Sequence, residues 1–351
     1  HSYVTGRYAP TPQDVPTVFA QFGRYAVAVN GHDAPIKLYP VTSNTAKAVP
    51  FGWSTRPAPC QPQPIVDSSI GNVYATSATT DDVTVALPKQ NTIGVGNSTA
   101  ASQNAYRYRY SWVSEDGSES PLSEPSPVVS WQTATGGWRY GVTVTSIQAG
   151  PAGTKTRRIY RTKNLGGTET YENLTYYYLA DVANNFETLY ADITPDGLLG
   201  SQAPTDTDSA PLPAVIRWIT SHAGRSWIVS GDYRVHWSLP LQYESFGAIN
   251  YVDVSTRTGG LVTGLLPNND LLLVLREKSI DAIYDAGNGL VRATPLIGTL
   301  GTRAPHAAIS VPEIGVFILA DDGLYLMQGS LAGGSQIVSK LATSQVSTLW
   351  A

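Results

Sequence analysis

A strand, turn, strand pattern that recurs near residues 225, 270 and 315 is the feature that most constrains the fold. In each copy an apolar run leads into a short polar turn and then into a second run of alternating character. Trp227, Leu272 and Phe317 occupy matching strands at intervals of 45 residues (227, 272 and 317). Weaker β-like runs precede and follow each hairpin, so each repeat predicts four strands. Four short strands in about 45 residues are typical of one blade of a β-propeller.

A fourth copy of the hairpin lies at residues 24–39, preceded by a short apolar run at 17–20. The middle strand at residues 271–275 is apolar on both faces, which is expected where neighbouring blades cover it on either side. We therefore predict an all-β chain containing a β-propeller with four or more blades. Residues 51–87 are a candidate for a less regular fifth blade. The alternative is a generic β-sandwich whose hairpins happen to have similar lengths.

The repeat stops after residue 95 and resumes near residue 211, with stretches of small residues and prolines at both joins. Between them, Tyr106–Val113 alternates aromatic residues with Arg and Ser, which predicts a half-buried strand. Further strands are predicted at 141–145, 156–162, 176–182 and 187–192. Short strands separated by turns indicate an inserted Ig-like or fibronectin III-like β-sandwich, and the absence of a cysteine pair favours the fibronectin-like form. The predicted domains are residues 1–95 (N-terminal part of the propeller), 96–205 (inserted sandwich) and 206–351 (C-terminal part of the propeller).

Composition limits the function classes. Charged residues make up only 14% of the chain, and the formal net charge is −4. Proteins that grip nucleic acid by its phosphates carry clustered basic surfaces, so tight DNA binding is disfavoured. Cys60 is the single cysteine, which excludes an internal disulfide and a cysteine-based zinc site. No apolar stretch approaches the roughly 18 residues that span a bilayer, so we expect no membrane insertion by this chain.

Motifs for catalysis are missing from the sequence. The five histidines are scattered, without the spacing of a metal-binding pair, and His236 is interpreted as an ordinary exposed or interfacial residue. There is no nucleophile elbow, no dinucleotide-binding loop and no Walker motif. We therefore predict that the chain is not an enzyme, with no catalytic residue, no metal site and no cofactor.

Three acidic features have a structural and a functional interpretation. Asp206 and Asp208 are candidate calcium ligands, but the remaining oxygen ligands of a loop site are missing. Asp321, Asp322 and Gly323 fit a hairpin turn. Carboxylates that recur near predicted turns leave a propeller glycosidase as an alternative, and these are Asp232, Asp281 and Asp322.

Aromatic residues leave two further alternatives open. The Tyr106–Trp112 ladder, interleaved with arginines, could stack bases and contact phosphates, but we favour the interpretation that its aromatic face is core and its arginine face is solvated. Trp131, Trp138 and Tyr171 could stack on sugar rings, as in a receptor-binding or carbohydrate-binding module. The binding residues of the chain stay unknown from sequence.

Several segments resemble propeller-type phage tail proteins, the nozzle or tail-tube B class at the end of short tails. The residues that carry the resemblance are the hairpins at 24–39, 225–240 and 270–284, with Tyr243–Phe246 and Ala320–Tyr325. The inserted region is similar to the sandwich of such proteins in Tyr106–Tyr110, Glu115–Pro121, Arg157–Thr162 and Tyr177–Val182.

The resemblance implies a structural virion protein located in the phage tail. Its subunits would form a ring, a hexamer in this family, around the DNA ejection channel. Expected partners are other copies of the chain and other tail proteins, namely an adaptor and tail fibres or spikes. DNA would pass through without specific binding, and a mildly acidic chain suits that role because a basic wall would retain phosphates. The sandwich would serve as a decoration or as a platform for fibres.

Overall fold

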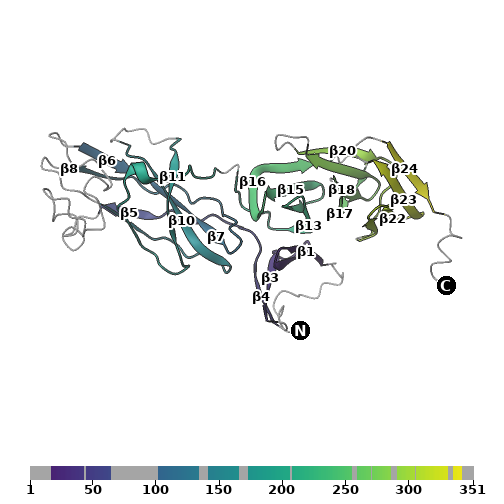
Figure 1. Cartoon of the computed structure of the whole chain (residues 1–351), viewed down its shortest axis with the longest axis horizontal. Coiled ribbons are helices and arrows are strands. Elements are labelled where there is room, and N and C mark those ends of the chain that lie inside the picture. Colours follow the sequence, from purple (N-terminus) through teal and green to yellow (C-terminus); the bar gives the residue numbers. More distant parts are fainter. Residues whose placement is uncertain are drawn as a thin grey trace. The chain divides into compact units, whose positions relative to one another are not determined.

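The computed structural model describes residues 17–42, 45–64, 102–133, 141–165, 173–205, 208–254, 259–269, 271–285, 291–304, 306–330 and 335–341. These residues form antiparallel β-sheets joined by turns, and they include a short 3-10 helix, η1 (Asp196–Leu198). The prediction of an all-β chain is confirmed. Contacts divide the chain into two compact units (Figure 1). We call residues 1–52 with 212–351 the repeat unit, and residues 53–211 the inserted unit.

The repeat unit contains four sheets of four strands, each paired in chain order. Sheet 1 consists of β1 (Val18–Phe22), β2 (Tyr25–Val29), β3 (Ile36–Thr42) and β4 (Thr45–Pro50). Sheet 2 consists of β13 (Ile216–His222), β14 (Arg225–Ser230), β15 (Arg234–Leu239) and β16 (Gln242–Asp253). Sheet 3 consists of β17 (Val262–Asn268), β18 (Leu271–Arg276), β19 (Ile280–Asp285) and β20 (Val291–Ile297). Sheet 4 consists of β21 (Ala308–Val311), β22 (Gly315–Ala320), β23 (Gly323–Ser330) and β24 (Ser335–Lys340).

The four sheets pack in series through their first strands. β1 packs against β13, β13 against β17, and β17 against β21 (Figure 1). Strand β18 is buried along its whole length, because its alternate side chains enter two different cores. Leu272 and Val274 belong to the core shared with sheets 1 and 2, whereas Leu273 and Leu275 belong to the core shared with sheet 4. The predicted covering of this strand on both faces is confirmed.

The spacing of the repeat differs slightly from the prediction. Strands β14, β18 and β22 begin at residues 225, 271 and 315, so the intervals are 46 and 44 residues and average 45. Leu272 and Phe317 are therefore not equivalent: Leu272 enters the core with the preceding sheets, whereas Phe317 lies opposite Ile309 and Leu326 on the face of sheet 4 that points away from sheet 3. A shift of one residue moves a side chain to the other face of a strand.

The inserted unit contains two three-stranded sheets and one two-stranded sheet. The first sheet has the order β11 (Tyr176–Val182), β10 (Thr154–Thr162), β7 (Tyr108–Ser114). The second has the order β12 (Tyr190–Asp192), β9 (Val142–Thr145), β5 (Gln61–Pro64). The remaining pair is β6 (Ser102–Tyr106) with β8 (Val129–Thr133). Strands of both three-stranded sheets contribute to one core, and that core includes Tyr108, Tyr110, Val142, Val144 and Ile159.

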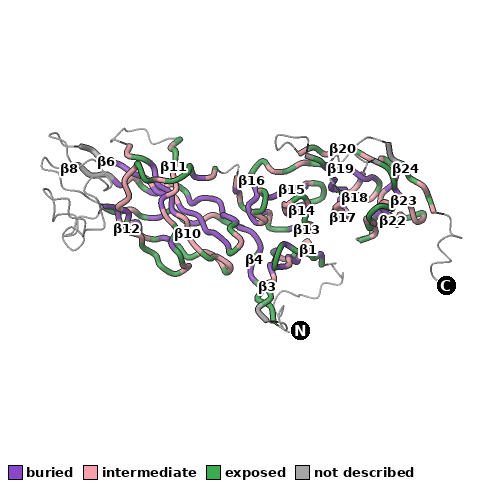
Figure 2. Tube along the Cα trace, in the orientation of Figure 1, coloured by how far each residue is buried: buried purple, intermediate pink, exposed green. Residues whose placement is uncertain are grey.

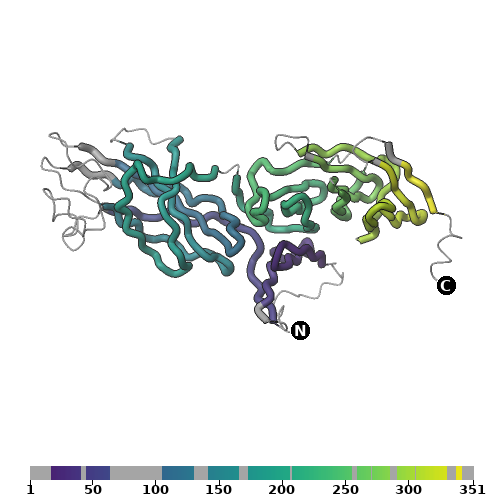
Figure 3. The backbone as a smooth tube through the Cα atoms, viewed as in Figure 1, coloured from purple at the N-terminus to yellow at the C-terminus, as the bar shows by residue number. Residues whose placement is uncertain are grey.

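The boundary between the units lies earlier than predicted. The inserted unit begins at Trp53 rather than at residue 96, and it ends at Pro211 rather than at residue 205. The physical reason is that β5 pairs with β9, while Trp53 and Cys60 pack in the core of the inserted unit. Most of the candidate fifth blade at 51–87 lies outside the described residues, and its described strand, β5, belongs to the inserted unit. Figure 3 shows the purple N-terminal strands and the green to yellow C-terminal strands in the repeat unit, with the blue to teal segments in the inserted unit.

Candidate functional site

His236 is half-buried on β15, where its Nε2 lies 2.7 Å from the Ser230 hydroxyl. Burial and then the positive charge of Arg234 lower the pKa of His236 to about 4. A serine beside a histidine is the start of a nucleophilic dyad, but a histidine with so low a pKa is a weak base at neutral pH. The nearby Asp253 accepts two hydrogen bonds from Arg234, at 2.6 and 2.8 Å. The arrangement therefore orders the edge of sheet 2 rather than activating Ser230.

The acidic residues singled out from the sequence are held by cations or by turns. Asp232 pairs with Arg217 at 3.2 Å, Asp281 with Arg276 at 3.1 Å, and Asp322 with Lys340 at 2.9 Å. Asp281 is the second residue of β19 and follows the turn between β18 and β19, so it lies near a turn as predicted. Asp321 and Asp322 form the two-residue turn between β22 and β23, also as predicted. Asp206 lies outside the described residues, and the carboxylate of Asp208 accepts hydrogen bonds from Thr205.

A buried ion pair joins sheet 1 to sheet 2. Lys37 of β3 donates to the carboxylate of Glu244 on β16, and both side chains are almost fully buried. The other carboxylate oxygen of Glu244 accepts a hydrogen bond from the backbone of Gly52 at 2.7 Å. Burial by itself lowers the pKa of Lys37, but the charge of Glu244 and the hydrogen bonds to Glu244 and Tyr39 together outweigh burial, so the pKa lies above its usual value. The pair fixes the stacking of the first two sheets.

A second buried cluster lies in the inserted unit around Arg161, whose side chain is fully buried. Its guanidinium donates to Asp192 at 2.7 Å and to Asp196 at 2.7 Å. Tyr108 donates to the same oxygen of Asp192 at 2.8 Å, and Arg161 lies 4.9 Å from the ring of Tyr106. The second oxygen of each carboxylate accepts a hydrogen bond from a backbone amide, at 2.9 Å for Asp192 and 2.7 Å for Asp196. All four carboxylate oxygens are therefore engaged within the chain, and we interpret the cluster as structural.

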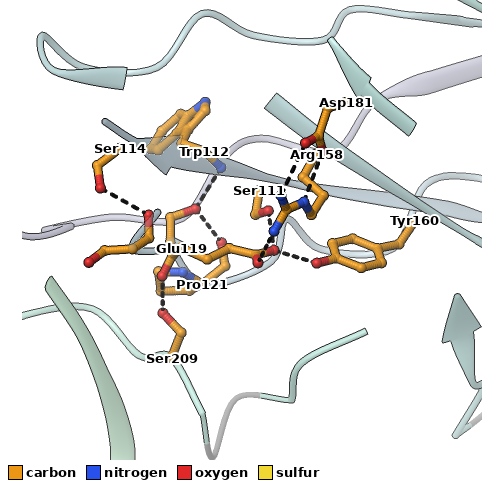
Figure 4. A network of polar contacts seen from close by, with 11 residues as sticks. Ser111, Trp112, Ser114, Glu119, Pro121, Arg158, Tyr160, Asp181 and Ser209 are labelled. Atoms are coloured by element: carbon orange, nitrogen blue, oxygen red, sulfur yellow. Dashed lines mark hydrogen bonds and ion pairs between the residues drawn. The ribbon is translucent and has the colours of Figure 1, made fainter. Parts of the chain in front are cut away.

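Glu119 is the centre of a polar network in the inserted unit (Figure 4). Its carboxylate accepts hydrogen bonds from Ser111, from Tyr160 at 2.6 Å and from Arg158 at 3.2 Å. Burial and the charge of Glu119 raise the pKa of Tyr160. Arg158 also binds both carboxylate oxygens of Asp181, at 2.8 and 3.0 Å. The network attaches the loop that contains Glu119 to strands β7, β10 and β11.

The segment that follows Glu119 covers one edge of β7. Serines at every third position bond to alternate residues of the strand: the backbone amides of Ser120, Ser123 and Ser126 donate to the carbonyls of Trp112, Tyr110 and Tyr108. The hydroxyls of the same serines accept from the amides of the same three strand residues, at 2.9 to 3.1 Å. An exposed edge strand is a template for unwanted pairing, and this segment blocks it.

The face of β7 opposite its aromatic residues is less solvated than predicted. The side chains of Arg107 and Arg109 are half-buried and donate to the carbonyls of Ser126 and Ser123, while Ser111 is buried. The aromatic face is core, as predicted. The arginines are therefore engaged within the chain, which leaves little of them to contact phosphates.

Sheet 4 presents an apolar face that no described sheet covers. Directly opposite residues in antiparallel strands share a face. One surface of sheet 4 is therefore defined by four pairings: Ile309 with Phe317, Phe317 with Leu326, Leu319 with Leu324, and Gln328 with Ile337. We call it the end face of sheet 4, and its members are Ile309, Phe317, Leu319, Leu324, Leu326 and Ile337. Apolar side chains of a covered face would be buried, but here three members are exposed: Ile309 is 60% exposed, Leu319 54% and Ile337 65%.

Sheet 1 presents a second apolar face at the opposite end of the series. This face is defined by four pairings: Phe19 with Ala28, Ala28 with Ile36, Leu38 with Ala26, and Leu38 with Ala48. We call it the end face of sheet 1, and its members are Phe19, Ala26, Ala28, Ile36, Leu38 and Ala48. Phe19 is 63% exposed and Ala48 is exposed, whereas Ala26, Ile36 and Leu38 are half-buried and the small side chain of Ala28 is buried. Figure 2 shows exposed stretches in green on sheets 1 and 4.

Several expectations concern features that the described residues do not include. Trp138 and Tyr171 lie outside them, and Trp131 belongs to β8 but its side chain is not described. Over the described ranges, no group of three or more His, Cys, Asp or Glu side chains is arranged to hold a metal ion. No helix in the described part of the chain is long and apolar enough to cross a membrane.

Comparison of the sequence with models of known protein families gives no match, and comparison with curated protein sequences gives none either.

The buried clusters could not be predicted from the sequence, because they join residues that are far apart in the chain. Lys37 and Glu244 are 207 residues apart in the chain, so no local pattern joins them. A signal was present in each strand alone: Lys37 interrupts an apolar strand, and Arg161 lies in the buried C-terminal half of β10. A charge at a core position requires a buried partner.

Proposed function

We propose that the chain is a structural protein of a phage tail, a nozzle or tail-tube component that assembles into a ring around the DNA ejection channel. The observation that carries the proposal is the series of four stacked sheets with an uncovered apolar face at each end. Monomeric soluble proteins rarely expose contiguous apolar surfaces of this kind, which mark sites of protein association.

The finer description of the fold belongs to the same proposal. We propose that the four sheets are consecutive blades of a β-propeller, because each has four antiparallel strands in chain order and packs through its first strand. We also propose that the inserted unit is a fibronectin-like sandwich, supported by two three-stranded sheets that share one core. A propeller interrupted by such a sandwich is the combination that resembles tail proteins.

The electrostatics of the described residues are consistent with a structural role. Three buried cations contact an acid directly, and the pairs are Lys37 with Glu244, Arg161 with Asp192, and Arg276 with Asp281. Such pairs stabilise one arrangement of the sheets when both partners are present. A fourth buried cation, Arg157, donates to the backbone carbonyls of Ile147 and Asn184. With a net charge of −4, the chain lacks the basic excess that would retain DNA in a channel.

The test is the location of the chain in purified virions of the phage that encodes it. We expect the chain in those virions, with antibody label at the tail end, and ring-shaped particles of the purified chain in electron micrographs. Expression in infected cells without incorporation into virions would contradict the proposal.

A further inference from the structure

We infer that the end face of sheet 4 is a docking surface for the end face of sheet 1 of a second copy, so that copies associate head to tail. The inference rests on the proposed function in one respect: it names the surfaces through which the proposed ring would form. It is argued from the stacking of the sheets alone.

The stacking inside the chain defines two kinds of sheet face. Aligned by their first residues, β18 and β22 place Leu273 and Leu275 at the positions of Phe317 and Leu319. Leu273 and Leu275 are buried against sheet 4, with Leu275 only 3% exposed. The end face of sheet 4 is therefore the same kind of face that sheet 3 presents to the next sheet in the series.

The end face of sheet 1 is the matching half. When β2, β18 and β22 are aligned by their first residues, Ala26 is equivalent to Leu272 and Val316. In the same alignment, Ala28 is equivalent to Val274 and Ile318. Those residues of β18 and β22 are buried against the preceding sheet. The end face of sheet 1 is the kind of face that receives a preceding sheet, and in this chain no described sheet precedes it.

The surface that fits the end face of sheet 4 is thus on the chain itself. The equivalent faces of sheets 2, 3 and 4 are already covered, because each packs against the sheet that precedes it in the series. Among the described strands, sheet 4 does not pack against sheet 1 of the same copy, because β21 contacts β17 but makes no comparable contact with β1. The occupant is therefore the end face of sheet 1 on another copy.

The chemistry of the two faces suits this contact. Most residues of the two faces are apolar, with Gln21 beside Ala26 on the first face and Gln328 beside Ile337 on the second. Burying apolar area stabilises association by about 25 cal/mol per Å² before the costs of ordering. Two different surfaces that meet head to tail form a heterologous interface, which closes into a ring or extends as a filament. A closed ring agrees with the proposed role around a channel.

The experiment uses two full-length variants, each with one face blocked by a carboxylate. Leu319→Glu blocks the end face of sheet 4, and Phe19→Glu blocks the end face of sheet 1. We expect each variant alone to be monomeric in sedimentation at concentrations where the wild-type chain is assembled. An unpaired charge buried in the contact should weaken it about 100-fold or more. Mixed together, the two variants should form a dimer with one copy of each and nothing larger, because each keeps one intact face.

A matched control is Leu189→Glu in the inserted unit, since Leu189 and Leu319 are both 54% exposed. This variant should assemble as the wild type does. Ile309→Glu and Ile337→Glu are second variants on the end face of sheet 4, and circular dichroism checks that every variant is folded. They should reproduce the result of Leu319→Glu.

Three outcomes would overturn the inference. Wild-type oligomers that persist in both blocked variants would show that copies associate through other surfaces, and the proposed tail function would stand. Loss of assembly in only one variant would indicate a contact between identical surfaces. A wild-type chain that stays monomeric at all concentrations would remove the docking contact and count against the ring as well. Incorporation into virions is measured separately, so failure of the docking contact and failure of the tail function are distinguishable.

Discussion

Strands β18 and β22 are six residues long, lie at equivalent places in successive sheets, and are both almost entirely apolar. All six positions of β18 are buried, whereas β22 buries only Val316 and Ile318. The difference does not lie in the strands, because Leu275 and Leu319 are the same residue at the same position. It lies in what covers them: sheet 4 covers sheet 3, and no described sheet covers the end face of sheet 4.

The comparison separates two roles of apolar residues in one repeated sheet. In a covered sheet, apolar residues on both faces stabilise the fold of the single chain. In an end sheet the same pattern stabilises the fold through one face only, and we propose that the other, exposed face serves association. Substitutions at paired positions should therefore affect unfolding in the first case and assembly in the second.

The largest effect should follow loss of the buried carboxylate between sheets 1 and 2. Glu244→Ala leaves Lys37 buried without its counter-charge, and we expect a loss of about 3–5 kcal/mol in the free energy of unfolding. Denaturant unfolding followed by tryptophan fluorescence measures it. A loss no larger than that of an exposed ion pair would show that the two sheets do not depend on this contact.

The next effect compares the two equivalent leucines. Leu275→Ala opens a cavity between sheets 3 and 4 and should cost about 2–5 kcal/mol of stability. Leu319→Ala should change the stability of the monomeric chain by no more than about 0.5 kcal/mol, because this side chain is exposed there. Equal losses in thermal or urea unfolding would mean that the end face of sheet 4 is covered in the monomer.

A smaller effect should appear as a pH dependence from His236. Its pKa of about 4 in the folded chain lies below the value of 6.5 for an ordinary histidine. The unfolded chain therefore binds more protons between these values, and stability should fall as the pH falls from about 6.5 toward 4, while it is fully present above that window. Unfolding of His236→Asn, measured at several pH values, should lose this part of the dependence. An unchanged slope in the variant would assign it to other groups.

The smallest effect belongs to the ion pair of Asp322 with Lys340, which is the exposed counterpart of Lys37 with Glu244. Both side chains are solvent-exposed on the end sheet. Water and salt screen such pairs, and they contribute little to stability. Asp322→Asn should therefore unfold at the same denaturant concentration as the wild type. A clear destabilisation would indicate that this turn is more constrained than its exposure implies.

The sequence predicted the strands well because their signals are local. Among the described residues, the predicted hairpins are present at 24–39, 225–238, 271–284 and 315–329, and the strand at 106–113 buries its aromatic face. Local signals do not fix which strand pairs with a distant one. The start of the inserted unit was placed at residue 96 because nothing in residues 61–64 indicates that they pair with residues 142–145.

The candidate site was harder to predict because its parts are defined by relations between sheets. Whether Leu319 is buried depends on a neighbouring sheet, and the sequence of β22 is the same in either case. The register error between Leu272 and Phe317 has the same origin, since a one-residue shift in the repeat changes the face of a strand and leaves its composition unchanged. The clusters around Glu119 and Arg161 join residues brought together only by folding.

The central claim is that the end face of sheet 4 is covered by sheet 1 of another copy when the chain assembles. Electron cryomicroscopy of the assembled wild-type chain tests it most directly, because the map shows which sheet lies on Leu319 and Ile337. We predict that β1 to β4 of the next copy lie there and continue the stacking found inside the chain. A map in which copies touch elsewhere, with both end faces open to solvent, would contradict the account.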